Sequence, residues 1–218
     1  MRLPQSVQVI ERGWLSANNI VLHAQDETVV VDSGYVAHAP QTLDLLEHAL
    51  AGKTLARLVN THCHSDHMGG NAAIQKKFHC RTSIPKGEAP LIDRWDQREL
   101  ILSAADQRAE RFAYDDTFGG GDTLAMGEYE WQVLAAPGHD THAVMFYSPE
   151  TRVLISGDAL WENGFGAVFA SSSVVTPRSP RHARPWSASP LSTAKSWSPA
   201  TAGRSGTSVL RSSARFPA

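Results

Sequence analysis

The sequence predicts an α+β fold in which sheets of strand hairpins form the core and single helices pack outside them. Short apolar runs separated by polar turn residues occur in 18–34 and again in 142–160, a pattern typical of β-hairpins. Between them, residues 39–52 carry leucines at helical spacing. Hairpins mixed with isolated helices favour a sheet-on-sheet core with helices on the outer faces.

The elements follow in order from the N-terminus. Two apolar runs, Ile20–Leu22 and Val29–Val31, flank a polar turn and predict the first hairpin. The next segment predicts a helix that ends before Gly52. Its apolar face is formed by Leu43, Leu46 and Leu50. A short β-rich run then ends at Asn60.

The chain after Asn60 predicts both helices and strands. The pattern indicates a helix start at 69–78, a strand at 81–84, an inserted helical segment at 88–111, a return to strands at 119–139 and a second hairpin around the turn at 148–150.

Composition excludes several classes of protein. The 218 residues are 42% hydrophobic with a net charge of −2, which favours neither a nucleic-acid binder nor a membrane protein. No apolar run is long enough to span a bilayer, and the N-terminus lacks the apolar region of a signal peptide. The two cysteines, Cys63 and Cys80, are too few for a disulfide scaffold, so we expect a reducing, cytoplasmic setting.

The stretch "VNTHCHSDHMGGN" carries the chemistry. His62, His64, Asp66 and His67 fall within six residues. In an extended segment alternate side chains share a side, so His62 and His64 are expected to face together while Cys63 points away. Asp66 and His67 come where the chain turns toward the next helix, a turn that we expect the two following glycines to permit.

Neutral imidazole and carboxylate are common zinc ligands. Clustered imidazoles repel one another when protonated and add little packing energy, so this cluster favours a metal site. Isolated histidines are instead interpreted as solvated or hydrogen-bonded. They are His23, His38, His48 and His79.

The segment "THCHSDH" resembles the His-x-His-x-Asp-His signature of metallo-β-lactamase-fold hydrolases. Three further blocks resemble that family in the same order: "VVVDSG" at 29–34, "APGHDTH" at 136–142 and "LISGDAL" at 154–160. The likeness extends over roughly residues 8–169. It implies an αββα sandwich that usually binds two metal ions, most often zinc.

The resemblance also implies a role for each site residue. The first metal would be held by His62, His64 and His139. The second would be held by Asp66, His67 and a histidine from a C-terminal Gly-His block, with Asp158 bridging the two metals. Asp66 would also act catalytically, by orienting the attacking water and passing a proton to the leaving group. Asp32 is interpreted either as a partner that fixes a ligand histidine or as a turn residue.

The substrate is less constrained. The family hydrolyses thioesters, lactams, lactones and phosphoesters. Without an export signal, a glyoxalase II-like thioesterase or a broad esterase is favoured over a β-lactamase. We expect a small-molecule substrate, with no nucleic acid or membrane partner, and leave the oligomeric state open. Candidates for the pocket wall are His142, Trp161, Glu162, Asn163 and Phe165, and candidates for a cover are Trp95, Arg98 and Tyr114. Ordinary packing is the favoured interpretation for most of them, and a surface position is an equal alternative for His142.

The composition changes abruptly after Ala170. Residues 1–170 carry 13 Lys and Arg and 22 Asp and Glu, whereas residues 171–218 carry seven Lys and Arg, 13 Ser, six Pro and no acidic residue. We therefore expect an incomplete metallo-β-lactamase-like domain at 1–170 and a Ser/Pro/Arg-rich tail at 171–218. Such a tail lacks the apolar periodicity of packed elements, so no regular structure is expected in it.

Two explanations of the tail remain open. It is either a natural disordered segment or the product of a frameshift, which the abrupt break favours. Residues 203–208, "GRSGTS", can be encoded by codons that read Val-Val-Pro-Gly-His when displaced by one base. The tail's own histidine, His182, follows no strand or glycine and is not assigned as a ligand.

The second metal would therefore lack the ligand that the C-terminal Gly-His block supplies in the family, and this has consequences for function. We expect this chain to bind one metal ion or fewer tightly and to be an impaired hydrolase. Two alternatives on the same fold are a non-catalytic metal- or ligand-binding protein and an iron-dependent oxygenase.

Overall fold

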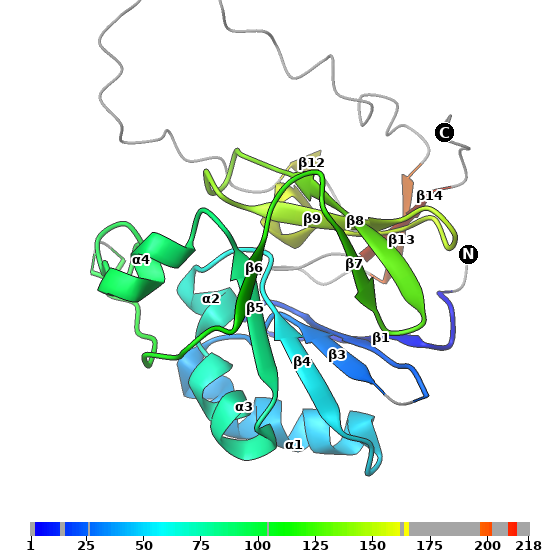
Figure 1. The fold of residues 1–218 in the computed structure, drawn as a ribbon, viewed down its shortest axis with the longest axis horizontal. Coiled ribbons are helices and arrows are strands. Elements are labelled where there is room, and N and C mark those ends of the chain that lie inside the picture. The colour runs from blue at the N-terminus through cyan, green and yellow to red at the C-terminus, as the bar shows by residue number, and fades with distance from the viewer. Residues whose placement is uncertain are drawn as a thin grey trace, which may run out of the picture.

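The computed structural model describes residues 3–13, 16–25, 27–103, 105–161, 164–165, 197–201 and 209–212. It contains two facing sheets, with helices packed below the first sheet (Figure 1). These layers confirm the α+β class and the predicted sheet-on-sheet core. None of the helices in the described ranges combines the length and the apolar character that a membrane crossing requires.

The first sheet has the strand order β1-β2-β3-β4-β5-β6. Its strands are β1 (Val7–Ile10), β2 (Asn19–Leu22), β3 (Thr28–Val31), β4 (Leu55–Val59), β5 (Arg81–Pro85) and β6 (Asp116–Phe118). The predicted hairpin forms the antiparallel pair β2–β3, whereas β3 to β6 run parallel. Because parallel strands end at the same edge, the loops after β3, β4 and β5 meet there.

The second sheet is antiparallel, with the order β13-β14-β10-β9-β8-β7. Its strands are β7 (Thr123–Met126), β8 (Tyr129–Ala135), β9 (Val144–Ser148), β10 (Val153–Ile155), β13 (Trp197–Thr201) and β14 (Val209–Ser212). The predicted hairpin is β9–β10. A separate two-stranded sheet pairs β11 (Leu160–Trp161) with β12 (Gly164–Phe165).

The main core lies between the sheets. Side chains from the first sheet, such as Ile20 and Val31, pack with Trp131, Val133 and Phe146 of the second. Trp131 and Phe146 are fully buried, and burial of each such side chain stabilises the fold by about 1.5–3 kcal/mol. The alternation of buried residues along β8 shows that this strand has one face on the core and one exposed face.

A second core lies beneath the first sheet, where α1 (Ala39–Leu50) and α3 (Asn71–Phe78) pack (Figure 1). Leu46 and Leu50 are buried there, and Leu43 is partly buried beside them, as the helical spacing predicts. The helix α1 ends at Ala51, whose left-handed backbone lets its N–H reach the carbonyl of Glu47. Gly52 follows just past the end.

The inserted segment contains less helix than the sequence predicts. Only α4 (Ala89–Arg94) is an α-helix within 88–111. It ends at Trp95, which adopts a left-handed conformation with φ of 53°. The apolar residues of the segment still pack together, with Ile92, Leu100 and Leu102 buried beside Met68 of the short helix α2 (Ser65–Met68). Burial therefore does not require the helical continuation that the periodicity favours.

The tail also departs from expectation in part. We expected no regular structure in 171–218, but β13 and β14 lie in this range and extend the second sheet through the pair β10–β14. The other residues of the tail, His182 among them, lie outside the described part of the chain. The boundary at residue 170 stays a prediction.

Candidate metal centre

Loops from both sheets bring the predicted site residues to one edge of the sandwich. The segment 62–67, which carries the motif, follows β4, whereas His139 follows β8 of the other sheet. Asp158 lies in the short 3-10 helix η2 (Gly157–Ala159) after β10. Because β8 and β10 point the same way in their sheet, residues after both strands reach the same side.

Three histidine nitrogens converge in a group that we call the first triad: His62, His64 and His139. Nδ1 of His64 lies 3.1 Å from Nε2 of His62 and 2.9 Å from Nε2 of His139. The His62 side chain is fully buried. Cys63 is buried in a separate apolar cluster, which agrees with the prediction that its side chain points away from the two histidines. All three nitrogens are thus close enough together to bind one cation.

A second triad combines His62, His67 and Asp158. Nε2 of His67 lies 3.3 Å from Oδ1 of Asp158, and Nε2 of His139 lies 3.3 Å from its Oδ2. One oxygen of Asp158 therefore faces each triad, an arrangement that would let this carboxylate contact two metal ions. Asp66 lies at the margin, with its Oδ2 3.7 Å from Nε2 of His67 and its side chain 27% exposed.

The surroundings set the charge of these groups. Burial, reinforced by the neighbouring histidines, lowers the pKa of His62 well below its ordinary value, which favours the neutral, ligating form. Burial opposes a charge on Asp158, but the histidines around it lower its pKa to about 2. Burial also opposes a charge on His67, but Asp158, Asp32 and Asp66 together raise its pKa well above the ordinary value.

Asp32 contacts His67 of the second triad and orients its ring. It is fully buried at the end of β3, and its Oδ2 lies 2.9 Å from Nδ1 of His67. The same carboxylate accepts hydrogen bonds of 2.8 Å from the backbone N–H and the hydroxyl of Thr61. Asp32 thus contacts a candidate ligand histidine and directs its other nitrogen toward Asp158, which is the role expected of a supporting carboxylate.

The glycines beside the motif serve close packing rather than an unusual turn. Gly69 has an ordinary helical φ of −61°. A Cβ there would lie 2.4 Å from the carbonyl oxygen of Ser65 and 2.5 Å from the backbone nitrogen of Val36. At Gly70 it would lie 2.5 Å from the carbonyl oxygen of Ser33. These positions need glycine because the loop after β3 packs directly on α2.

The donor set fits a metal ion. Nε2 of His67 and Oδ1 of Asp158 are buried and lie 3.3 Å from each other, but neither makes a hydrogen bond of good geometry within the described residues. Leaving such groups without a partner is costly, and a bound cation would satisfy both. Histidine nitrogen with carboxylate oxygen is the donor set of catalytic zinc sites.

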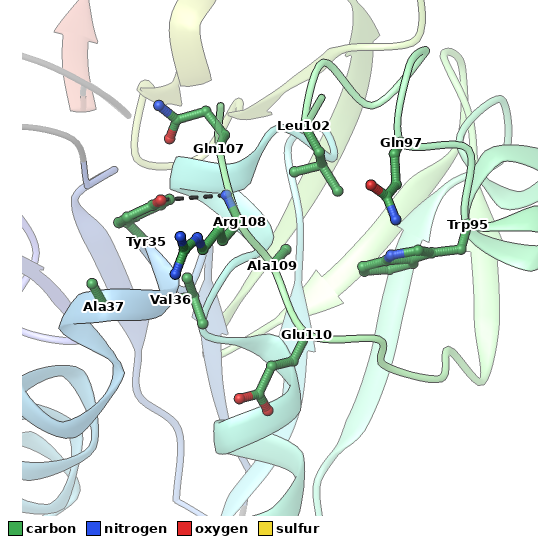
Figure 2. A pocket seen from close by; sticks show the side chains of 10 residues that line it. All are labelled: Tyr35, Val36, Ala37, Trp95, Gln97, Leu102, Gln107, Arg108, Ala109 and Glu110. Carbon is green, nitrogen blue, oxygen red and sulfur yellow. Dashed lines mark hydrogen bonds between the residues drawn. The ribbon is translucent and has the colours of Figure 1, made fainter. Parts of the chain in front are cut away.

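A pocket of about 610 Å³ lies beside α2, between the loop after β3 and the segment 95–110 (Figure 2). Trp95, a predicted cover residue, lines it together with Tyr35 and Arg108 (Figure 2). The hydroxyl of Ser65, next to Asp66, donates to Gln107 of the pocket wall over 3.2 Å. The pocket therefore adjoins the helix that carries Asp66 and His67.

The other predicted pocket residues are placed differently. Arg98 and Tyr114 do not line this pocket, and the hydroxyl of Tyr114 instead donates to Asp93. His142 is exposed and packs against Gly87, where a Cβ would lie 2.2 Å from the imidazole. The side chains of Trp161, Glu162, Asn163 and Phe165 lie outside the described part of the chain.

Sequence reasoning missed two acidic residues at this edge. Asp140 directly follows the ligand candidate His139, and its Oδ2 lies 3.4 Å from Nε2 of His64. Glu88 begins the segment of α4 and is 1% exposed. The position of Asp140 within "GHD" could have marked it, but nothing in the local sequence connects Glu88 to the histidines.

Comparisons with known proteins identify the family of this chain. A family model described as "Metallo-beta-lactamase superfamily" matches residues 12–193. A hydroxyacylglutathione hydrolase of Hyphomonas neptunium is 30% identical over 148 residues, covering 62% of this chain and 50% of that protein. Its namesake from Brucella ovis is 29% identical over 118 residues, covering 54% of this chain and 38% of that protein. The chain thus spans half or less of these relatives' length.

Solved structures share the fold. The BLEG-1 B3 metallo-beta-lactamase aligns with a TM-score of 0.62 at 24% identity, covering 74% of this chain and 76% of that one. A metallo-beta-lactamase of Cronobacter sakazakii aligns with a TM-score of 0.58 at 19% identity, covering 68% of this chain and 59% of that one. At these identities the likeness concerns the fold alone.

Proposed function

The chain belongs to the metallo-beta-lactamase superfamily, and we propose that it is a metal-dependent hydrolase of a small-molecule thioester or ester. The observation that carries this proposal is the convergence of three histidine nitrogens, with Asp158 facing both triads. The curated relatives named hydroxyacylglutathione hydrolase support a thioester as the substrate class.

The first triad would hold one ion, which we propose to be Zn²⁺. His67 and Asp158, with Asp66 beside them, would hold a second. When bound, the metal would supply a water of lowered pKa and a Lewis acid for the carbonyl of the substrate. The pKa shifts of His62 and Asp158 favour the neutral and the ionised form that binding requires, whereas the raised pKa of His67 means that a metal binding there would displace a proton.

Asp66 is the proposed proton carrier. Its partial exposure distinguishes it from the buried Asp158, and its Oδ2 lies beside His67 at the margin of the second triad. From there the carboxylate can accept a proton from the attacking water and return it to the leaving group. Asp32 would not touch substrate, because it is buried behind His67 and Thr61.

We further propose that the second metal binds weakly in this chain. The family's third ligand for that metal comes from a C-terminal Gly-His block, and His182 is the sequence's only histidine after Ala170. A site with fewer ligands binds its ion less tightly, so turnover would be impaired.

Turnover of thioester, ester, lactone, lactam and phosphodiester substrates by the zinc-loaded protein tests the proposal. We expect thioester or ester cleavage, reduced about 10²–10⁴-fold by Asp66→Asn. The matched control is Asp44→Asn, at an exposed position on α1. Bound metal without turnover of any substrate would favour a binding protein, and oxygen consumption by the iron-loaded protein would favour an oxygenase.

A further inference from the structure

Three buried polar side chains beside His67 have no role in the proposed reaction. They are Ser33 in the loop after β3, Asn60 at the end of β4 and Asn71 at the start of α3, and we call them the amide cluster. Each is 0% exposed. Burying a hydroxyl or an amide group is costly unless it is hydrogen-bonded, so three of them at one place call for a structural or functional reason.

The amide cluster converges on the carbonyl oxygen of His67. This residue lies in the four-residue helix α2, and the last carbonyls of a helix have no partner within it. The carbonyl oxygen instead accepts hydrogen bonds from the backbone N–H of Ser33 over 2.7 Å and from Nδ2 of Asn60 over 3.1 Å. Two loops of the first sheet therefore hold the backbone of one candidate ligand.

The other bonds of the amide cluster form a chain that leads to the same carbonyl. The hydroxyl of Ser33 accepts from the backbone N–H of Gly70 over 3.0 Å and lies 2.7 Å from Oδ1 of Asn71 and 2.9 Å from the carbonyl oxygen. Because two N–H groups already use the lone pairs of that carbonyl, the single hydroxyl proton is assigned to Asn71. Nδ2 of Asn71 donates to Oδ1 of Asn60 over 2.7 Å, which directs the amide nitrogen of Asn60 toward His67.

Neighbouring residues on the same two strand ends hold the ring of His67. Asp32, directly before Ser33, has its Oδ2 2.9 Å from Nδ1 of the ring, and it accepts a hydrogen bond from the hydroxyl of Thr61, directly after Asn60. One residue of each consecutive pair thus acts on the ring, and the other acts on the carbonyl. With both held, the ring has a single direction in which to present Nε2.

We propose that the amide cluster is a positioning device that holds the backbone of His67 so that its Nε2 is presented to the second metal. This inference rests on the proposed metal centre. A buried polar network whose members satisfy one another rigidifies its surroundings and specifies one arrangement. A cluster that only stabilised the fold would differ in one respect, because breaking it would leave the ring of His67 unaffected.

The test uses two variants that break the chain and one matched control. Ser33→Ala removes the hydroxyl, and Asn60→Ala removes the amide that donates to the carbonyl. Thr82→Val is the control, since it removes another fully buried hydroxyl, on β5, which accepts a 2.6 Å hydrogen bond from Gln75. Urea unfolding of all three variants measures how much each destabilises the fold.

The first readout is the exchange of the ring Nδ1 proton of His67 with water, measured by NMR in ¹⁵N-histidine-labelled apoprotein. Loss of roughly one hydrogen bond should make this exchange about 5–10-fold faster in Ser33→Ala and Asn60→Ala. Thr82→Val should change the rate by less than about twofold, even where its loss of stability is similar. The double variant should show less than the product of the two single effects, because both break the same chain.

The second readout is stepwise titration of the apoprotein with Zn²⁺ against a competing chelator. We expect the second equivalent to bind about 10–100-fold more weakly in Asn60→Ala, and the first to stay within about threefold of wild type. If Asn60→Ala fails to fold, Asn71→Ala replaces it, since it breaks the chain one step earlier.

Two outcomes would overturn this proposal and leave the proposed function intact. One is an exchange rate of the His67 ring proton that is the same in wild type, Ser33→Ala and Asn60→Ala. The other is equal weakening of both zinc equivalents in the folded variants. A wild-type chain that binds no Zn²⁺ would instead overturn the proposed function, while the exchange rates would still decide whether the amide cluster positions the ring.

Discussion

The two triads share His62 but differ in charge and in support. The first consists of three imidazoles from two loops, and Oδ2 of Asp140 lies 3.4 Å from Nε2 of its His64. The second adds a carboxylate, and Asp32 lies behind it. Three histidines with one open position form a complete catalytic ligand set, whereas the second triad relies on the shared His62 and on the bridging Asp158. We infer that the first triad binds its metal ion tightly and that the second triad, at the same edge of the sandwich, binds its ion weakly.

Removing the shared ligand should have the largest effect. His62→Ala takes a nitrogen from both triads, so we expect loss of bound metal and a fall in turnover beyond the roughly 100-fold limit typical of supporting residues. Metal analysis and thioester kinetics on the same samples check this. His48→Ala, at an exposed position on α1, is the control; unchanged metal content in His62→Ala would refute the assignment.

Supplying the missing ligand should reduce the difference between the triads. If the tail is frameshifted, shifting the reading frame by one base after about codon 170 should give a protein that contains a Gly-His block. We expect that protein to bind close to two metal ions and to hydrolyse a thioester much faster than the 218-residue chain. Equal metal stoichiometry and equal turnover in the two proteins would defeat the frameshift hypothesis.

Weakening the support of one triad should leave the other intact. Asp32→Asn retains a residue type that tolerates the left-handed backbone of this position, where φ is 60°. The change removes the charge beside His67, so we expect the second metal to bind about 10–100-fold more weakly. Zn²⁺ titration should show no more than about a threefold change for the first. A larger loss at the first metal would mean that the triads are not separately supported.

The two cysteines report on regions near and far from the triads. Both are buried, and Cys63 lies within the ligand loop. We expect a chelator to speed the reaction of Cys63, but not of Cys80, with a thiol reagent at pH 8, because metal removal loosens that loop. Mass spectrometry of the labelled peptides locates the reaction, and equal acceleration at both positions would indicate global loosening instead.

Alkaline pH should have the smallest effect. Burial raises the pKa of Cys80 to about 11, whereas an unfolded thiol ionises near 9.0. Ionisation then favours the unfolded chain first, so this contribution to stability is present below pH 9 and is lost as pH rises toward 11. Urea unfolding of the wild type and of Cys80→Ala between pH 8 and 10.5 should show a shallower pH dependence for the variant. Parallel curves would contradict the assignment.

Local patterns were sufficient to predict the hairpins, the helix α1 and the ligand motif. The turn residues fix β2–β3 and β9–β10, and the leucine spacing fixes the buried face of α1. The extended stretch at His62 and His64 predicted that both side chains face the same side, because side chains alternate along such a segment.

Contacts between distant loops could not be predicted in the same way. Asp140 meets His64 only because the loops after β8 and β4 belong to facing sheets, and no local periodicity encodes that meeting. The helical pattern of 88–111 failed because packing against Met68 buries Leu100 and Leu102 without a helix. The strands β13 and β14 were missed because a composition rich in Ser and Pro carries little strand signal.

The most direct test is the metal content of the purified chain after dialysis against metal-free buffer. We predict about one tightly bound zinc per chain, lost in His139→Ala, which removes a ligand of the first triad only. Asp66→Asn should retain that ion, because Asp66 belongs to neither triad. Two ions retained equally by the wild type, or one ion that persists in His139→Ala, would contradict the distinction between a strong and a weak position.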